Sequence, residues 1–278
     1  MNQTSLRAKA ETLRRLHDKP NILILPNVWD LASARLVEIA GYPALATTSS
    51  GIAFSLGYPD GEKISRETMI DVCGRIARRA SVPVSADIEA GYGSDPRDTE
   101  ETVRLCIEAG IAGGNIEDGT HDRARPLFPL DMAVGRIRAA RRAADAAGVP
   151  FVINARTDHY LAGGKPDAAG FEETVRRGRA YREAGADCIF IPGVTDRDLI
   201  GRLAQAIDAP INILARPNGP SVPELKALGV ARVSVGGMLM LATLGLVRRA
   251  AAELAGPGTY GFAEGMAMHG DMNKLLET

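Results

Sequence analysis

Eight short apolar runs, separated by longer helix-forming segments, constrain the fold of this chain more than any other feature. The runs are rich in Ile, Val, Leu and Ala and do not alternate with polar positions, which is typical of strands buried on both faces. Successive runs start between 21 residues (from 211 to 232) and 38 residues (from 44 to 82) apart, enough for a crossover helix each time. The predicted strands are 22–25, 44–47, 82–87, 113–116, 151–154, 188–191, 211–214 and 232–235.

The segments between these runs carry start and stop signals of helices. Ser65 opens a segment that extends to residue 80, and Asp95-Pro96 opens one that extends to residue 109, with Pro at a first-turn position. Four segments end in Ala-Gly before the next run, where Gly suits a left-handed cap, at Gly41, Gly110, Gly148 and Gly185.

Eight strand–helix units predict an α/β fold, a (β/α)8 TIM barrel that makes residues 1–278 a single domain. A doubly wound parallel sheet is the alternative. It usually shows a glycine-rich first turn, but the first run here continues into Pro26-Asn27-Val28-Trp29-Asp30, so the dinucleotide-binding fingerprint is absent.

The last forty residues lie beyond the eighth unit. Residues 238–254 predict a helix, and Gly256-Pro257-Gly258 breaks it. Residues 260–276 are apolar but contain three glycines, so they need a packing surface. We therefore predict that 256–278 is an oligomerisation segment; the alternative is that it folds back on its own barrel.

The charge balance and the cysteines exclude several classes of protein. Lys and Arg total 33 against 34 Asp and Glu, so no net basic field attracts nucleic acid or an anionic membrane. Cys73, Cys106 and Cys188 lie far apart, which argues against a disulfide framework or a zinc site and favours a reducing cytosol. The N-terminus is polar, and no apolar run approaches the ~18 residues of a membrane span. We expect a cytoplasmic protein.

Acidic residues follow two neighbouring predicted strands at the end where barrels place their catalytic groups. Asp87 and Glu89 are two residues apart and face the same side if the strand stays extended, and Glu117 lies at the matching level of the next strand. Three acids repel one another unless a cation joins them, and all-oxygen ligands favour Mg²⁺ or Mn²⁺ over zinc. The alternative is that each acid only caps a helix.

Two further groups at the strand ends suit an anion. The guanidinium of Arg156 matches a carboxylate or phosphate, although Asp158 or Glu117 can equally be its structural partner. Ser49, Ser50 and Gly51 form a polar turn whose N–H groups can cradle an anion; a plain tight turn is the alternative.

The segment 119–129 is predicted to be a mobile lid, because it has Gly at one end, two Pro at the other and polar residues between them. If it carries a general acid, His121 is the best candidate. His17 and His269 are expected at the surface.

Taken together, six motifs resemble those of the isocitrate lyase and phosphoenolpyruvate mutase superfamily, and the match covers nearly the whole chain. They are Leu-Pro-Asn-Val-Trp-Asp at 25–30, Thr-Ser-Ser-Gly at 48–51, Leu-Gly-Tyr-Pro-Asp at 56–60, Ala-Asp-Ile-Glu-Ala-Gly-Tyr-Gly at 86–93, Asn-Ile-Glu-Asp at 115–118 and Ile-Asn-Ala-Arg-Thr-Asp at 153–158.

The resemblance implies a carboxylic acid bound to Mg²⁺ and an enolpyruvate-type intermediate. It implies that Asp87 ligates the metal, that Glu89 and Glu117 hold its waters, and that Asp60 lies near the same shell. It assigns the substrate carboxylate to the turn at 49–51 and the enolate oxygens to Arg156. It also implies a helix exchanged between subunits and a tetramer built as a dimer of dimers.

This chain departs from the resemblance at three places. The loop after Glu117 has no Lys-x-Cys-Gly-His sequence, which the tricarboxylate lyases carry. Pro192 stands where the mutases have His and the lyases Glu. The run 232–235 is followed by Gly-Gly-Met, without the His of the oxaloacetate decarboxylase branch.

The prediction is therefore a Mg²⁺-dependent lyase that cleaves a C–C bond or decarboxylates a small 2-oxo or 2-hydroxy acid. One alternative is P–C bond chemistry of the phosphonopyruvate hydrolase or phosphoenolpyruvate mutase kind, with Arg216, or Arg123 and Arg125, on the phosphonate. Another is a non-catalytic binder of 2-oxo acids.

Overall fold

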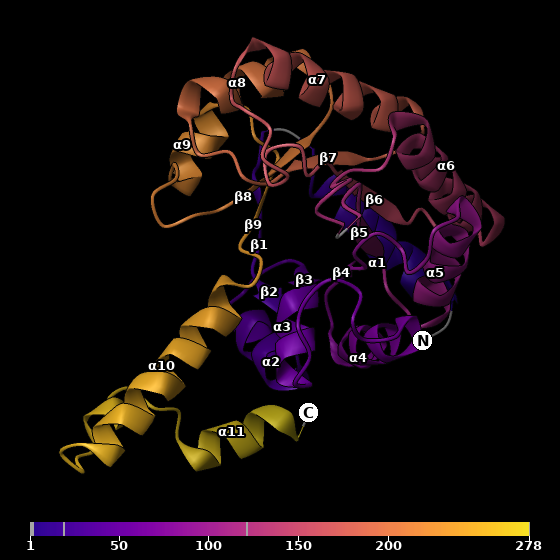
Figure 1. The fold of residues 1–278 in the computed structure, drawn as a ribbon. Coiled ribbons are helices and arrows are strands. Elements are labelled where there is room, and N and C mark those ends of the chain that lie inside the picture. The colour runs from indigo at the N-terminus through magenta and orange to yellow at the C-terminus, as the bar shows by residue number, and fades with distance from the viewer. Residues whose placement is uncertain (1–2, 19, 121, 278) are drawn as a thin grey trace.

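A parallel sheet curled into a barrel forms the centre of the computed structural model, which describes residues 3–18, 20–120 and 122–277 (Figure 1). Neighbouring strands pair in the order β1-β9-β8-β7-β6-β5-β4-β3-β2. The strands are β1 (Leu23–Leu25), β2 (Asn27–Val28), β3 (Leu45–Thr47), β4 (Val84–Asp87), β5 (Gly113–Glu117), β6 (Val152–Arg156), β7 (Cys188–Ile191), β8 (Ile211–Leu214) and β9 (Arg232–Ser234).

The two ends of this order are consecutive pieces of the chain. β1 pairs with β9 and β2 pairs with β3, and only Pro26 separates β1 from β2. Because Pro has no N–H to donate, the ladder is interrupted at this residue while the strand continues. Each of the eight predicted strands is thus confirmed, and β2 continues the first one beyond its predicted end at residue 25. The circular order excludes the doubly wound sheet. The fold is a TIM barrel.

The helices lie outside the barrel (Figure 1), and α4 and α5 begin where the sequence signals predict. Ser65 caps α4 through the N–H of Thr68, and Asp95 caps α5 in a reciprocal box with Asp98. The helices are α1 (Gln3–Arg15), α2 (Leu31–Ile39), α3 (Ser49–Ser55), α4 (Arg66–Arg79), α5 (Pro96–Glu108), α6 (Leu130–Ala146), α7 (Ala168–Glu183), α8 (Arg197–Ala206), α9 (Val222–Ala227), α10 (Met238–Ala255), η1 (Gly261–Ala263) and α11 (His269–Leu276).

The first helix packs near the N-terminal ends of the strands. A Cβ atom on Gly113, the first residue of β5, would lie 2.9 Å from Cδ2 of Leu13. His17, which follows this helix, is 5% exposed, and its Nδ1 lies 2.8 Å from the carbonyl oxygen of Leu13. The expectation that His17 lies at the surface is therefore wrong. Burial, reinforced by the positive charge of Arg232, lowers the pKa of His17 to about 4.

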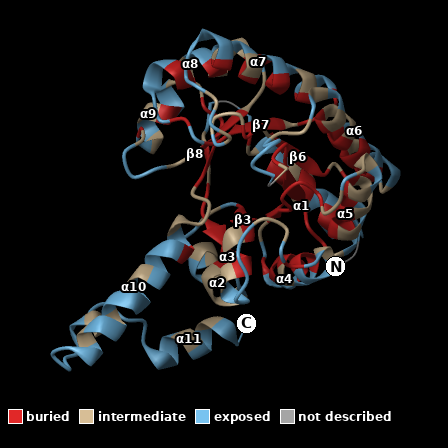
Figure 2. Cartoon of the chain, in the orientation of Figure 1, coloured by how far each residue is buried: buried red, intermediate tan, exposed pale blue. Residues whose placement is uncertain are grey.

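The described part of the C-terminal segment forms an arm. In Figure 1 α10 leaves the barrel and α11 turns back toward α2, where Nε of Arg35 donates to the carbonyl oxygen of Leu275 at 3.4 Å. The predicted helix at 238–254 is confirmed as α10. Its 18 residues include one buried side chain, Met240, and Figure 2 shows most of the arm exposed. No described helix, α10 included, combines the length and apolarity needed to cross a membrane.

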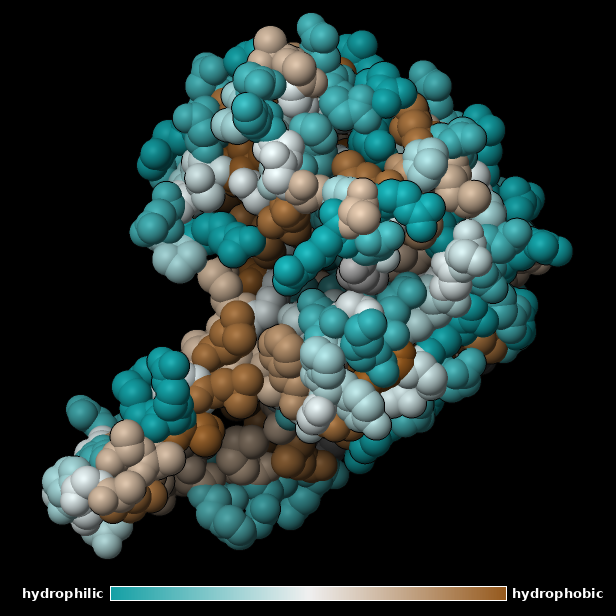
Figure 3. Space-filling view, viewed as in Figure 1, coloured by the Kyte–Doolittle hydropathy of each residue, from teal (hydrophilic) through white to brown (hydrophobic). Residues whose placement is uncertain are grey.

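Apolar side chains gather on this arm and beside it, as the brown surface in Figure 3 shows. A helix of this length with one buried residue gains little from burial in a single chain. The exchange of the segment 256–278 between subunits therefore stays a prediction that the exposed surface supports. The large exposed apolar residues of the arm are Leu239, Leu241, Leu244, Leu246, Val247, Leu254, Tyr260, Met266, Met268 and Leu276.

We expect the chain to be larger than a monomer in light scattering, and deletion of residues 256–278 to yield smaller or aggregated species. The reason is that the deletion removes α11, which contacts α2, and η1, which contacts α10, so more apolar surface of both helices is exposed. An intact chain that scatters as a 29.5 kDa monomer would contradict the exchange.

We also expect stability to fall in acid because of His17. The folded pKa of about 4 lies below the ordinary 6.5, so the unfolded chain binds a proton first as the pH drops. The stabilisation is complete above pH 6.5 and is lost as the pH falls toward 4, by about 3 kcal/mol. Urea unfolding at several pH values measures it, and His17→Gln, which does not titrate, should show a smaller acid loss. Equal pH dependence in both proteins would argue against this assignment.

Candidate active site

A cavity of about 350 Å³ opens at the carboxyl ends of the strands. Residues at or just after the ends of β2 to β9 line it, as expected for a barrel whose catalytic groups sit at this face. Its charged lining residues are Asp60, Asp87, Arg156 and Arg216. Of the residues predicted to act in the site, these four and Ser49 and Ser50 line the cavity.

Asp87, the last residue of β4, is the acid whose surroundings are most specific. It is 8% exposed, and its N–H donates to Oγ1 of Thr47 at 2.9 Å. Its Oδ2 accepts from Ser49 twice, from the N–H at 3.1 Å and from Oγ at 2.9 Å. Its Oδ1 is buried and accepts from none of the residues that the structure describes. A buried carboxylate oxygen without a donor is costly, so this atom suits a cation or a water.

Asp60 lines the same cavity. Desolvation raises the pKa of Asp60, and the negative charge of Asp87 raises it further. The prediction that Asp60 lies near the shell of Asp87 is consistent with this coupling.

Glu89 does not continue the strand, so the argument that placed it on the same face as Asp87 is wrong. β4 ends at Asp87, and Glu89 has a φ of 49°, in the left-handed region that ends an extended strand. Its carboxylate accepts from the N–H of Glu62 at 2.6 Å and from the hydroxyl of Tyr92 at 3.1 Å. Desolvation and Asp87 raise the pKa of Glu89 to about 7. Glu89 is 3% exposed and is not part of the cavity lining.

Glu117 and Arg156 are paired across β5 and β6. Their register places them opposite each other, and Oε2 of Glu117 lies 2.7 Å from Nη1 of Arg156. Nε and Nη2 of Arg156 contact the two carboxylate oxygens of Asp158 at 2.5 and 2.9 Å. Burial raises the pKa of Glu117 well above its usual range, although Arg156 opposes this. Arg156 therefore has the structural partners that the sequence allowed, and it also lines the cavity.

A direct three-ligand metal centre is not formed by the described residues: no three Asp, Glu, His or Cys side chains among them come close enough together to hold one ion. Metal binding by Asp87, Glu89 and Glu117 stays a prediction. In it Asp87 contacts the metal directly, and Glu89 and Glu117 contact it through water. The buried, undonated Oδ1 of Asp87 is the observation that fits such a metal.

The polar turn at 49–51 is the first turn of α3. Thr48 caps this helix, and Oγ of Ser50 lies 3.0 Å from Oγ1 of Thr48. Gly51 lies behind the cavity lining, where a Cβ atom would be 2.5 Å from Cγ2 of Thr48. Close packing therefore explains why position 51 is a glycine. Substrate binding by these three residues stays a prediction.

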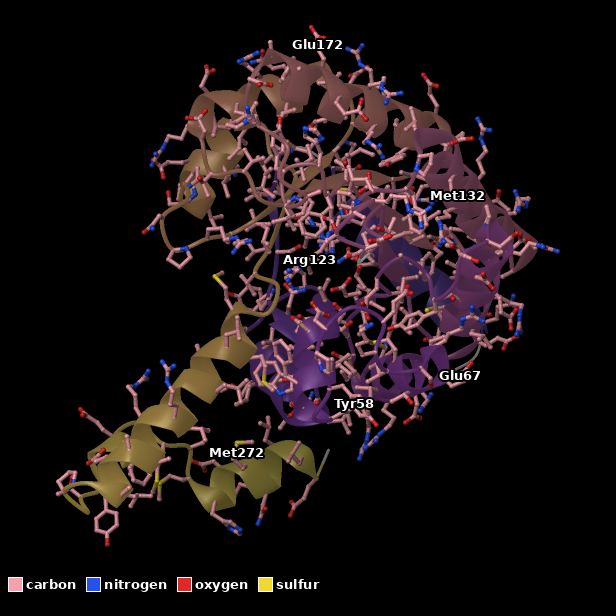
Figure 4. The ribbon with its side chains drawn as sticks, viewed as in Figure 1. Tyr58, Glu67, Arg123, Met132, Glu172 and Met272 are labelled. Carbon is pink, nitrogen blue, oxygen red and sulfur yellow. The ribbon has the colours of Figure 1, made fainter. Side chains whose placement is uncertain are left out.

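The segment 119–129 forms a turn closed by a bridge between Gly119 and Leu127. It borders a second groove of about 580 Å³ that Arg125 lines, apart from the cavity of Asp87. Arg123 is exposed in the same segment and is labelled near the centre of Figure 4. His121 lies outside the described residues. The mobility of this lid stays a prediction.

Sequence reasoning missed most of the apolar wall of the cavity. Phe54, Leu161, Leu214 and Leu241 line it, but an apolar residue beside a strand end looks the same in the sequence as a core residue. The sequence assigns no role in the site to Asn27, which is one residue of the motif at 25–30. Its Oδ1 accepts from the N–H groups of residues 235 and 236, and its Nδ2 donates to the carbonyl of Thr47, so it joins the strand ends around the cavity.

Asp118 supports the ion pair of Arg156 and Asp158 through the backbone of Asp158. Its Oδ1 accepts from the N–H of Asp158 at 2.7 Å. Its Oδ2 accepts from Nη1 of Arg177 at 3.0 Å and from the hydroxyl of Tyr181 at 2.6 Å. All three partners are buried, so Asp118 links α7 to the loop that orients Arg156.

Fold and site together define a (β/α)8-barrel protein with an acid- and arginine-lined cavity at the carboxyl ends of its strands. Residues 13–255 match the family model described as phosphoenolpyruvate phosphomutase. The chain belongs to this family, and with it to the isocitrate lyase and phosphoenolpyruvate mutase superfamily of lyases and mutases. The resemblance inferred from the motifs is confirmed.

Three proteins to which this chain is similar illustrate the range of sequence identity. A crystal structure from Burkholderia cenocepacia, assigned only provisionally as a lyase or mutase, is 43% identical with a TM-score of 0.92, covering 99% of this chain and 98% of that one. The 2-methylisocitrate lyase of Escherichia coli is 32% identical over 74% of this chain and 70% of its own. A phosphonopyruvate hydrolase in complex with oxalate and Mg²⁺ is 26% identical with a TM-score of 0.84, covering 97% and 95%.

We expect Asp118→Ala to lower the free energy of unfolding by about 3–5 kcal/mol, because it leaves the buried Arg177 without one of its two carboxylate partners. Tyr181→Phe is the matched control: it removes one donor to the same carboxylate and should cost about 1–3 kcal/mol. Urea unfolding measures both. Losses below about 1 kcal/mol for Asp118→Ala would show that the network is not a structural support.

Proposed function

We propose that the protein is a Mg²⁺-dependent lyase that cleaves a C–C bond of, or decarboxylates, a small 2-oxo or 2-hydroxy acid through an enolpyruvate-type intermediate. The observation that carries this proposal is the buried Oδ1 of Asp87, without a donor, in a cavity that Arg156 also lines. A carboxylate beside a guanidinium suits a substrate that binds through a metal on one side and through the arginine on the other.

The residues present fit the metal. Asp87 would hold Mg²⁺ or Mn²⁺ directly, and Glu89, Glu117 and Asp60 would act through its waters. When bound, the metal supplies a Lewis acid that polarises the substrate's oxygens. Burial raises the pKa values of Glu89 and Glu117, and the negative charge of Asp87 raises both further. A divalent ion held nearby would favour the ionised form of each carboxylate.

The chain's own residues would orient the acid. Ser50, with Ser49 and Gly51 in the same turn, would bind the substrate carboxylate, and Arg156 would face the oxygen that becomes negative as the neighbouring bond breaks. Because Glu117 and Asp158 hold two edges of this guanidinium, its position is set before substrate binds.

The cavity lining favours decarboxylation over a C–C cleavage that must begin with removal of a proton by a protein base. No His, Cys or Lys is among its described residues. Decarboxylation needs an electron sink and no base to begin. His121 is the candidate for protonating the product, from the segment 119–129.

Two alternatives remain as proposals. Arg216 lines the cavity and would contact a phosphonate if the reaction were P–C cleavage, whereas Arg125 lines the other groove. A binder of 2-oxo acids without turnover would use the same residues.

We further propose that the protein works in the cytoplasm, where its buried cysteines stay as free thiols. We also propose that it is a homotetramer built as a dimer of dimers.

We expect Asp87→Ala to lose Mg²⁺-dependent turnover by about 10²- to 10³-fold or more while the barrel stays folded, because the metal loses its direct ligand. The measurement is steady-state turnover of oxaloacetate, phosphonopyruvate and alkylmalates with Mg²⁺ and with a chelator. Asp198→Ala, at an exposed acid on α8, is the control and should keep full activity. An Asp87→Ala protein with full activity would contradict the assignment of Asp87 as the metal ligand.

A further inference from the structure

Most polar and most apolar residues of the cavity lining come from different parts of the sheet. Strands β2 to β6 and the residues that follow them contribute its polar groups, among them Asn27, Ser50, Asp87, Asn115 and Arg156. From β7 onward the lining turns apolar: Phe190, Pro192, Leu214, Ala215, Met238 and Leu241. Two further apolar residues come from other segments, Leu161 from the loop after β6 and Phe54 from α3. Arg216 and Ser234 are the polar side chains on the β8 and β9 side.

Contacts locate the boundary and the extent of this wall. The guanidinium carbon of Arg156 lies 5.8 Å from the centre of the Phe190 ring, so the charged and apolar halves meet there. A Cβ atom on Gly193 would be 3.1 Å from Cδ2 of Leu161, which places Leu161 over the end of β7. A Cβ atom on Gly236 would be 3.0 Å from Cδ1 of Leu214, which places Leu214 against the residues that follow β9.

Little in this half of the described lining can receive a charge. Pro192 has neither a backbone donor nor a polar side chain. The hydroxyl of Ser234 is engaged with Asn212 at 2.9 Å. Arg216 is exposed, so it can meet an anion only at the rim. A carboxylate pressed against Phe190 and Pro192 would lose water without gaining donors, whereas an alkyl group would gain from leaving water.

We propose that the acid bound in this cavity carries a short alkyl group, and not a further carboxylate, against the wall formed by Leu161, Phe190, Pro192, Leu214 and Met238. The inference rests on the proposed function for the orientation of the acid, with its carboxylate toward Asp87 and Arg156. Small-molecule sites occupy ~300–1,000 Å³, and this cavity of about 350 Å³ lies at the lower end, so the alkyl group has about one to three carbons.

Binding of acids that lack a cleavable bond tests the wall without requiring turnover. The probes are pyruvate, 2-oxobutanoate, 2-oxopentanoate and 2-oxoglutarate, titrated calorimetrically with Mg²⁺ present. Each added methylene should lower the dissociation constant about fourfold, the factor that corresponds to ~0.8 kcal/mol. 2-Oxoglutarate, which has a carboxylate in place of the terminal methyl of 2-oxopentanoate, should bind at least about tenfold more weakly than that acid.

A variant of the wall and a matched control make the test specific. Leu161 is 44% exposed, so Leu161→Asn changes polarity at similar size with little risk to folding. It should reduce the preference for 2-oxopentanoate over pyruvate severalfold. Ile39→Asn, at a 62% exposed residue of α2 outside the cavity, should leave that preference unchanged.

The outcomes separate this inference from the proposed function. An alkyl preference that Leu161→Asn weakens supports the wall even if no cleavable acid turns over, in which case only the lyase proposal fails. Turnover of acids with no alkyl preference in binding, or tighter binding of 2-oxoglutarate than of 2-oxopentanoate, overturns the wall and leaves the lyase proposal standing. No binding of any of the four acids overturns both.

Discussion

The arrangement of the site depends on one guanidinium held between buried carboxylates. The register of β5 and β6 sets Glu117 opposite Arg156, and Asp158 takes the other edge of the same side chain. Charges removed from water are tolerated only when their partners are in place. Asp118 accepts from the backbone N–H of Asp158 and so fixes the position of that residue, while Arg177 is the charge partner of Asp118 itself. The site therefore consists of ion pairs at the strand ends, and the cavity lies beside these pairs.

The fold was largely predictable because burial on both faces leaves a signal in the sequence. Eight apolar runs gave the eight strands, and Ser65 and Asp95 marked helix starts that the structure has. What the sequence could not give were consequences of packing at a distance. His17 looks like a surface histidine until the end of α1 is placed near the N-terminal ends of the strands, and Pro26 looks like a strand end until its neighbours pair on two sides.

The site was predictable where a residue follows directly from the position of a strand end, and it was not where the chain turns. Asp87 and Arg156 end their strands and line the cavity. Glu89 was misplaced because the chain turns there with a left-handed φ. Its carboxylate accepts from the N–H of Glu62 and the hydroxyl of Tyr92, contacts that no periodicity predicts. The apolar wall left no signal of its own, since Leu161 is equally compatible with a core position.

The exposed arm and the cavity are parts of one element. Met238 and Leu241 belong to the first turns of α10 and line the cavity, while Leu244 and Val247 stand exposed further along the same helix. Since a helix moves as a stiff rod over such distances, whatever covers its outer part also fixes the angle at which its first turns meet the cavity. Contacts on the outer part of α10 and the shape of the apolar side of the cavity are therefore linked. Asp87 and Arg156 are instead held directly by residues outside α10, namely Thr47, Ser49, Glu117 and Asp158.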